Sequence, residues 1–437
     1  MPDVAHAHDL KAQVQATRGA GRKLAGLTTE QRNRILVDAA DSMERRSDEI
    51  LAANQNDCDL ALAAKIAQPL LKRLKTTSAG IAEMAMRVRD VAKLNDPLGH
   101  VLATTELDEG LVLEKVPCPL GVVAVIFESR PDAVPQVSSL AMKTGNGLVL
   151  KGGVEARHSN RVLVSIWRDA LAAHDPALSD SICLLEDRAE VMQVLQMDRE
   201  IDLVVPRGST EFVNFVFRNS RIPVLGHGAG ICHVYVDRAA DLGMATAVVV
   251  DSKIQYPAAC NAAEKVLVHR EIAAAFLPQV VQALQSVHVE VRVDEECRRL
   301  CAGADLVPAT EEDWSTEYSD LRITIKVVSC LDEAMDHIER YGSRHTEAII
   351  TRDSDAAARF MEQVDAASVF HNASTRFADG FRFGLGAEIG ISNSKLHARG
   401  PVGLEGLLTY KYKLRGSGQL VADYVAGGRR FTHRKGK

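Results

Sequence analysis

From residue 121 onward, short apolar runs alternate with longer amphipathic segments. The apolar runs cover residues 121–127, 148–151, 181–185, 202–206 and 222–226, and the amphipathic segments between them cover 131–145, 155–174, 188–198 and 209–219. A run that is apolar at nearly every position predicts a strand buried on both faces, as strands of parallel sheets are. We therefore expect an α/β fold in which helices cover both faces of a parallel sheet.

The same alternation resumes near Val234 and predicts a second α/β unit. Its expected helices are 238–253, 271–285 and 332–341, and its expected strands are 265–269, 323–328 and 347–351. The first hundred residues instead predict a helical lead-in. Thr28 and Gln31 have the spacing of a capping box, and apolar residues then recur at helical intervals: Ile35, Leu36, Ala39, Met43, Ile50 and Leu51.

Two strand-like segments fit neither unit. They fall within 106–120 and 400–422, and Gly or Pro interrupts both. Strands that leave their own domain often complete a neighbour's sheet, so we expect an oligomerisation flap and a homo-oligomer, dimer or tetramer. The basic, glycine-containing tail at 423–437 is expected to be solvated and partly disordered.

Composition narrows the class of partner. The 437 residues carry a formal net charge of −6, which does not favour nucleic acid or an anionic membrane as a partner. The start of the chain lacks the basic and apolar regions of a secretory signal, and no apolar stretch has transmembrane length, so we expect a cytoplasmic protein. Eight scattered cysteines without zinc-site spacing fit a reducing compartment and predict no metal site.

Cys260 has the local context of a nucleophile. It follows Pro257 in the sequence YPAACNAAE, where a new helical turn is expected to begin. Amide groups at a helix start would favour a thiolate and could bind an oxyanion on an attached carbonyl. The alternative is an inert buried cysteine, and the residues around Cys260 leave the two interpretations equally supported.

Candidate phosphate-binding turns follow two expected strands. Lys151, Gly152 and Gly153 follow one, and the sequence Pro206 to Thr210 follows another. In an open parallel sheet, ligands bind outside the carboxyl ends of the strands. No GxGxxG fingerprint supports a standard dinucleotide loop, and ordinary βα turns with glycine would look the same.

Three polar clusters could hold an anionic substrate. Each combines a fixed cation with hydroxyl, amide or imidazole groups, which suits a carboxylate or a phosphate. The candidate residues are Arg130, Asn372, Ser374, Arg376, His397 and Arg399. Solvated polar loops are the alternative for all three clusters.

Long motifs in a fixed order resemble the γ-glutamyl phosphate reductase family. They are PLGVVAVIFESRP, KTGNGLVLKGG, VVPRGS, IPVLGHGAGICHVYVD, PAACNAAE, VFHNASTRF, FGLGAEIGIS and KLHARGPVG. The resemblance spans essentially the whole chain and is nearest to the reductase half of pyrroline-5-carboxylate synthases. No glutamate kinase half precedes it, so we expect a separate kinase chain to supply the acyl phosphate.

The resemblance implies an aldehyde-dehydrogenase-like fold with three parts: a cofactor-binding domain at 1–105 and 121–233, a catalytic domain at 234–390, and the flap. It implies NADPH-dependent reduction of L-glutamyl 5-phosphate to L-glutamate 5-semialdehyde, the second step of proline synthesis from glutamate. The implied catalytic residues are Cys260, which carries the acyl group as a thioester, and Asn261. The implied cofactor-binding residues are Lys151, Gly152, Arg207, Gly208, Ser209 and Glu317.

One departure from the wider superfamily concerns the residue that activates water for hydrolysis of the thioester. Oxidising aldehyde dehydrogenases carry an acidic residue before a Gly-Gly pair, and here Leu225 or Gly226 occupies that position. Without a base to activate water, hydride should resolve the thioester. An oxidising aldehyde dehydrogenase and a catalytically silent scaffold that binds a kinase are the alternatives. Lys151 and Arg157 could bind a 2′-phosphate, whereas Glu155 could favour the free ribose of NADH.

Overall fold

The computed structural model describes residues 4–187, 189–226 and 228–436. The chain divides into two compact units. Unit 1 comprises residues 1–225, 385–390 and 402–437, and unit 2 comprises 226–384 and 391–401. The second unit thus begins at Gly226 rather than near Val234, and residues 385–390 return to unit 1. Among the described residues, no helix combines the length and apolar character needed to cross a membrane.

Unit 1 contains a parallel four-stranded sheet. Its order is β5 (Ile182–Leu185), β4 (Gly147–Lys151), β3 (Val122–Phe127) and β6 (Leu203–Arg207). Every residue of β3 and β4 is buried, as their continuous apolar sequences predict. One face packs on α1 (Val4–Ala25), α8 (Ala189–Val194) and α9 (Thr210–Asn219), and α6 (Ala133–Thr144) and α7 (Arg157–His174) contact the sheet as well.

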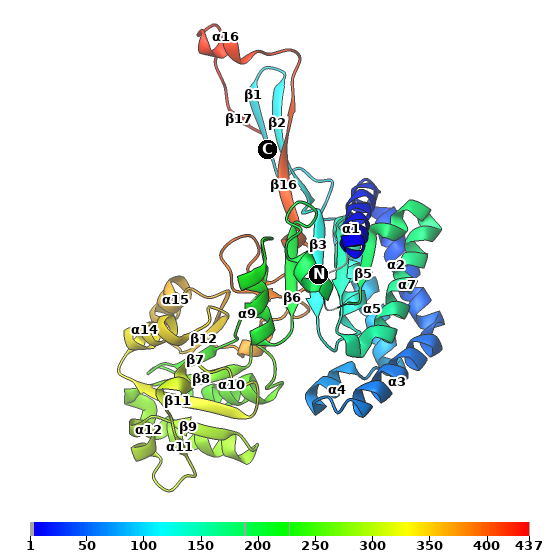
Figure 1. Ribbon diagram of the computed structural model, residues 1–437. Coiled ribbons are helices and arrows are strands. Elements are labelled where there is room, and N and C mark those ends of the chain that lie inside the picture. The colour runs from blue at the N-terminus through cyan, green and yellow to red at the C-terminus, as the bar shows by residue number, and fades with distance from the viewer. Residues whose placement is uncertain (1–3, 188, 227, 437) are drawn as a thin grey trace. The chain divides into compact units, whose positions relative to one another are not determined.

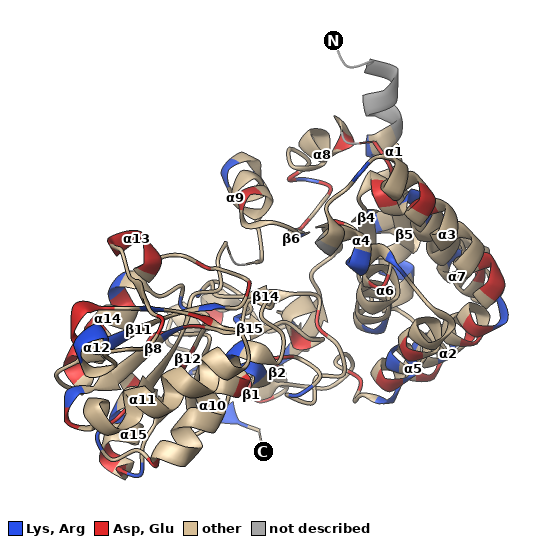
Figure 2. Ribbon diagram, turned by 90° about the horizontal axis from the view of Figure 1, so that it is seen from below, with Lys and Arg blue, Asp and Glu red and all other residues tan. Residues whose placement is uncertain are grey.

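The expected helical lead-in forms the outer part of unit 1. Its helices are α2 (Thr29–Arg45), α3 (Ser47–Ala63), α4 (Gln68–Leu74) and α5 (Ser78–Lys93). The capping box is confirmed, because the Thr28 hydroxyl accepts from the Gln31 amide and the Gln31 side chain accepts from the Thr28 amide. Figure 2 shows that basic and acidic residues alternate along the ribbons of α2, α3, α5 and α7.

The expected flap is a four-stranded sheet with the order β16 (Leu408–Arg415), β2 (Leu111–Pro119), β1 (Ala103–Asp108) and β17 (Arg434–Lys435). Its strands run side by side in Figure 1. The tail differs from the expectation of partial disorder, since β17 pairs with β1 and α16 (Val421–Val425) lies in the stretch before it. Ladder hydrogen bonds to Thr105 and Glu106 order this basic segment, although it stays exposed.

Unit 2 is built on a parallel seven-stranded sheet. The strand order is β10 (Val307–Pro308), β9 (Glu290–Val293), β11 (Arg322–Val328), β8 (Ala263–His269), β7 (Cys232–Val236), β12 (Thr346–Ile350) and β13 (Ser368–His371). One face packs on α10 (Leu242–Ile254), α11 (Arg270–Ser286) and α12 (Glu295–Leu300), and the other on α14 (Leu331–Tyr341) and α15 (Ser354–Gln363). The α/β class with parallel sheets is therefore confirmed.

Short elements complete the chain. They are α13 (Glu311–Trp314), the strand pair β14 (Ile391–Ser392) and β15 (Gly400–Pro401), and the 3-10 turns η1 (Val154–Ala156), η2 (Pro176–Ser181), η3 (Thr375–Phe377) and η4 (Glu405–Leu407). The flap is joined to the first sheet by Asn146, whose side chain accepts from the Gly121 amide and donates to the Leu407 carbonyl.

Candidate active site

Cys260 lies in a turn between α10 and β8. The turn is closed by hydrogen bonds from the Ala259 amide to the Tyr256 carbonyl (3.1 Å) and from the Ala262 amide to the Ala259 carbonyl (2.9 Å). The expected helix after Cys260 is wrong, because Ala263 already pairs with Cys232 as the first residue of β8. Cys260 is half-buried, and within the described residues its amide and that of Asn261 have no acceptor. These two amides can bind an oxyanion without a helix dipole.

Cys260 does not lie at the strand ends where parallel sheets usually bind ligands. Parallel strands bring ligands to their carboxyl ends, yet Cys260 precedes the amino end of β8. Ser319 and Leu321 precede the amino end of β11 in the same way. A shared hollow at this edge is lined by residues 256–258 and 319–322, together with Glu290.

Gly230 is a site residue that the sequence analysis missed. A Cβ placed on Gly230 would stand 2.0 Å from the Cys260 carbonyl oxygen and 2.7 Å from the Cys260 Cα. Only glycine therefore lets the chain pass so close to the backbone of Cys260. The Cys232 thiol adds a second contact, since it donates to the Cys260 carbonyl at 3.3 Å. The repeated glycines of GHGAG were the available clue.

Asn261 joins the Cys260 turn to the segment that follows β13. Its Nδ2 donates to the Ala378 carbonyl at 2.8 Å, and its Oδ1 is buried without a partner among the described residues. Ser374 is held to α10, because its hydroxyl lies 3.2 Å from that of Ser252, which also accepts from the Thr375 amide. The predicted cluster around Arg376 is thus fixed beside the Cys260 turn.

Arg376 is the cation of this cluster. Its Nε donates to Gln255 Oε1 at 2.8 Å, and its guanidinium lies 6.0 Å from the centre of the Tyr256 ring. Burial lowers the pKa of Arg376, the neighbouring Arg382 lowers it further, and negative charge on Cys260 would act in the opposite direction. A buried guanidinium whose cost of burial is relieved by negative charge suits an anionic ligand.

Two other predicted substrate residues have partners of their own. Asn372 follows the carboxyl end of β13, where its Oδ1 accepts from the Thr351 amide and its Nδ2 donates to the Thr351 carbonyl, each at 2.9 Å. Arg399 Nη1 forms an ion pair with Asp365 at 2.9 Å. His397, near Arg399, has a positive φ of 66°.

The cofactor candidates of unit 1 follow β4 and β6, at the carboxyl edge. Lys151 ends β4, and burial lowers the pKa of its ammonium although Glu155 acts against this effect. Gly152 has no room for a side chain, because a Cβ would lie 2.1 Å from Asn160 Nδ2. Ser209 caps α9 by accepting from the Phe212 amide.

Glu128 links two of these strand ends. Its carboxylate accepts from the Ser209 amide at 3.2 Å, and a Cβ on Gly208 would meet the same carboxylate at 2.6 Å. Arg207 Nη1 donates to Gln136 at 3.0 Å. Arg130, after β3, forms an exposed ion pair with Asp132 at 3.3 Å. The turns after β3 and β6 therefore contact one another directly.

Glu317 lies in the loop ahead of β11. Its side chain is half-buried and forms no hydrogen bond or ion pair with another described residue. Glu317 is thus an acceptor that a ligand could use.

The described residues contain no group of three or more His, Cys, Asp or Glu that could hold a metal ion.

The chain is similar to known proteins over nearly its whole length. Residues 2–299 match the model of the aldehyde dehydrogenase family. A γ-glutamyl phosphate reductase of Cyanothece is 56% identical over 98% of each chain, and one of Synechococcus is 54% identical over 99% of this chain and 96% of the relative. The crystal structure of γ-glutamyl phosphate reductase from Thermotoga maritima is 41% identical, covers 94% of this chain and 99% of its own, and gives a TM-score of 0.91.

Proposed function

Because the chain belongs to the γ-glutamyl phosphate reductases of the aldehyde dehydrogenase family, we propose that this oxidoreductase uses NADPH to reduce L-glutamyl 5-phosphate to L-glutamate 5-semialdehyde and phosphate. The reaction is the second step of proline biosynthesis from glutamate. The observation that carries the mechanism is the Cys260 turn, with a half-buried thiol beside two amides that have no acceptor in the described residues.

Cys260 acts as the nucleophile. Its thiolate attacks the γ-carbonyl, the bond to the phosphate oxygen breaks with its electron pair, and a thioester forms on Sγ. NADPH, when bound, supplies the hydride that reduces this thioester. The carbon–sulfur bond then breaks, which releases the aldehyde and restores the thiolate.

The neighbouring groups stabilise and orient the substrate. The amides of Cys260 and Asn261 bind the oxyanion that forms at the γ-carbon. Arg376, with Ser374 beside it, binds the α-carboxylate or the phosphate, and Asn372 supports the loop by holding Thr351. We place Arg130, His397 and Arg399 at the margin of the substrate site.

Residues of unit 1 hold the nucleotide. We assign Lys151, Gly152, Arg207, Gly208 and Ser209 to its phosphate- and ribose-binding turns, and Glu317 to binding of a nicotinamide ribose. The Glu155 carboxylate accepts from both the amide and the hydroxyl of Ser129 at 2.6 Å. Ser129 thus holds Glu155 through Oε1, and Lys151 and Arg157 offer cations for a 2′-phosphate, which supports NADPH over NADH.

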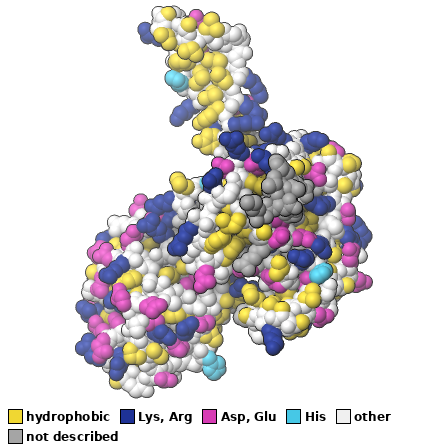
Figure 3. Space-filling view, in the orientation of Figure 1, with side chains coloured by type: hydrophobic (Ala, Val, Ile, Leu, Met, Phe, Trp, Pro, Cys, Tyr) yellow, Lys and Arg dark blue, Asp and Glu magenta, His cyan; other side chains and the backbone are white. Residues whose placement is uncertain are grey.

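The flap supports a homo-oligomer. Exposed apolar side chains gather along it, as Figure 3 shows; they include Tyr410, Tyr412, Leu414, Leu420 and Val421. A patch of this kind on a projecting sheet suits burial against a second copy of the chain.

We also propose a cytoplasmic location, because scattered cysteines suit a reducing compartment. A separate glutamate 5-kinase is the proposed source of the acyl phosphate.

The test is oxidation of glutamate semialdehyde in the reverse direction, with NADP and with NAD, in the presence and absence of phosphate. We expect NADP to be reduced only when phosphate is present, since phosphate resolves the thioester in this direction. Rapid oxidation without phosphate would instead indicate an ordinary aldehyde dehydrogenase. Cys260→Ser should abolish turnover while leaving the melting temperature unchanged, and near-normal turnover would refute the thioester.

A further inference from the structure

Three charged side chains are buried directly beneath the loop that carries Glu317. Lys253 of α10 and Glu264 of β8 form an ion pair of 2.8 Å, and the side chains of these two residues are 0% and 1% exposed. Lys265, the next residue of β8, is also fully buried. Burying charges costs more free energy than apolar residues of the same size would, so stability alone does not explain this cluster.

Glu264 and Lys265 hold the Glu317 loop from both sides. Glu264 Oε1 accepts from the Ser319 amide at 3.2 Å, and Lys265 Nζ donates to the Thr316 carbonyl at 2.8 Å. The two anchored residues bracket Glu317. Ser319 has a positive φ of 55°, a conformation that a non-glycine residue keeps only when its surroundings enforce it.

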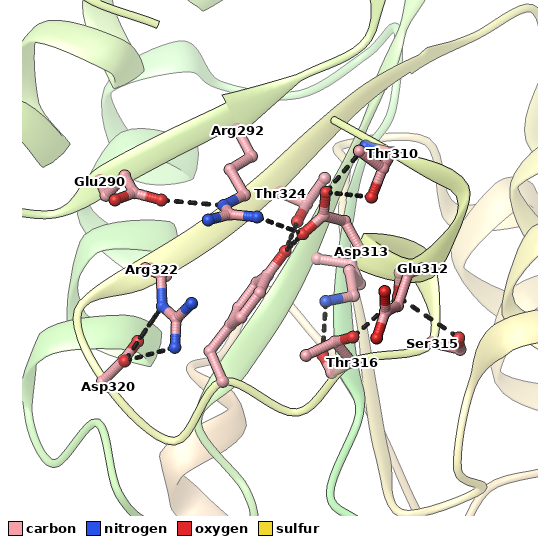
Figure 4. A network of polar contacts seen from close by, with 12 residues as sticks. Glu290, Arg292, Thr310, Glu312, Asp313, Ser315, Thr316, Asp320, Arg322 and Thr324 are labelled. Atoms are coloured by element: carbon pink, nitrogen blue, oxygen red, sulfur yellow. Dashed lines mark hydrogen bonds and ion pairs between the residues drawn. The ribbon is translucent and has the colours of Figure 1, made fainter. Parts of the chain in front are cut away.

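Tyr318 provides a third anchor. Its hydroxyl donates to Asp313 at 2.6 Å and lies 2.6 Å from the Thr324 hydroxyl. The Lys265 ammonium lies 4.4 Å from the centre of the Tyr318 ring. Figure 4 shows Arg292, Asp313 and Thr324 converging on this point, with the Asp320–Arg322 ion pair nearby.

Strand β8 also connects the Glu317 loop to Cys260, the proposed nucleophile. Glu264 follows Cys260 within the sequence CNAAE, and Lys253 lies at the end of α10, just before the Cys260 turn. Both the turn and the loop line the hollow at the amino edge of the sheet. Movement of β8 would therefore shift Cys260 and the Glu317 loop together.

We propose that Glu264 and Lys265 are positioning residues, which hold loop 315–321 so that Glu317 meets the nicotinamide ribose beside Cys260. The inference rests on the proposed function, because Glu317 needs a nucleotide to bind. Burial raises the pKa of Glu264 and lowers that of Lys265, as expected for groups held in place away from water.

Two matched double variants separate positioning from a purely structural role. Lys253→Met with Glu264→Gln removes the ion pair but keeps an oxygen for the Ser319 amide, whereas Lys253→Met with Glu264→Leu removes both. We expect the Leu variant to raise the KM for NADPH about tenfold over the Gln variant, the effect of one lost hydrogen bond to a fixed group, with a smaller change in kcat. Equal KM values for the two variants would overturn the role of Glu264.

Lys265→Met tests the other anchor and leaves the Lys253–Glu264 pair intact, so it is the variant more certain to fold. We expect about a tenfold rise in the KM for NADPH, and less than twofold when the change is made in a Glu317→Gln background, because the positioned carboxylate is then absent. An equal rise in both backgrounds, or none in either, would overturn the role of Lys265. Leu284→Ala, on the buried face of α11, is the control: it should lower the melting temperature without changing the KM.

Binding without turnover distinguishes failure of this inference from failure of the proposed function. The fluorescence of bound NADPH is titrated in a Cys260→Ser background, where no chemistry is needed. If the parent binds NADPH and Lys265→Met binds it equally well, the positioning role is wrong while the proposed function stands. If the parent does not bind NADPH, both are overturned.

Discussion

Replacing Gly230 by alanine tests the geometry of the Cys260 turn most directly. The new Cβ would lie 2.0 Å from the Cys260 carbonyl oxygen, about 1 Å closer than side-chain carbons approach such atoms, so the turn must move by a similar amount. A misplacement of about 1 Å costs roughly a hundredfold in rate. We therefore expect kcat/KM for phosphate-dependent oxidation of glutamate semialdehyde to fall about a hundredfold, with a loss of about 1–3 kcal/mol in stability from overpacking.

The assay follows NADPH absorbance, and the alkylation rate of Cys260 by iodoacetamide, read by peptide mass spectrometry, reports the thiol without turnover. Gly243→Ala is the matched control in the same unit, since its Cβ would meet only Asp241 at an ordinary 3.4 Å. It should keep normal activity and stability. If Gly230→Ala also kept kcat/KM within threefold of the parent, glycine would not be required beside the Cys260 backbone.

Three further predictions concern other contacts. Asn146→Ala should lower the free energy of unfolding in urea by about 2–4 kcal/mol, because the Gly121 amide and the Leu407 carbonyl lose their partner; a change below about 0.5 kcal/mol would contradict this. Burial, and secondarily the neighbouring His233, lowers the pKa of His337 to about 3, so stability is lost as pH falls below about 6.5, where the unfolded histidine takes up a proton. Between pH 6 and 4, the free energy of unfolding of His337→Phe should therefore fall by about 1.4 kcal/mol less per pH unit than that of the parent. The same pH dependence in both proteins would contradict a neutral, buried imidazole. Arg376→Lys keeps the charge but loses the Nε contact, and should raise the KM for glutamate semialdehyde roughly tenfold while leaving that for NADP unchanged.

The core elements could be predicted because their causes are local. The Thr28–Gln31 capping box depends on residues three apart, and the apolar runs of β3 and β4 identify strands buried on both faces without reference to any partner. The tail shows the limit of such reasoning. Its basic composition suggests disorder, yet β17 is ordered by pairing with β1, which is more than 300 residues away in the sequence.

The site shows the same division. Sequence by itself identified Cys260 as a candidate nucleophile and Arg376 as part of a candidate anion-binding cluster, and it determined that the chain is a parallel α/β protein of a reductase family. Only the tertiary structure decided that Cys260 precedes a strand rather than a helix, that Gly230 lies against its backbone, that Thr351 occupies the Asn372 amide, and that Glu264 and Lys265 hold the Glu317 loop. The physical reason is that propensity and periodicity act between near neighbours, whereas close approach and buried hydrogen bonds arise between residues that only the folded sheet brings together.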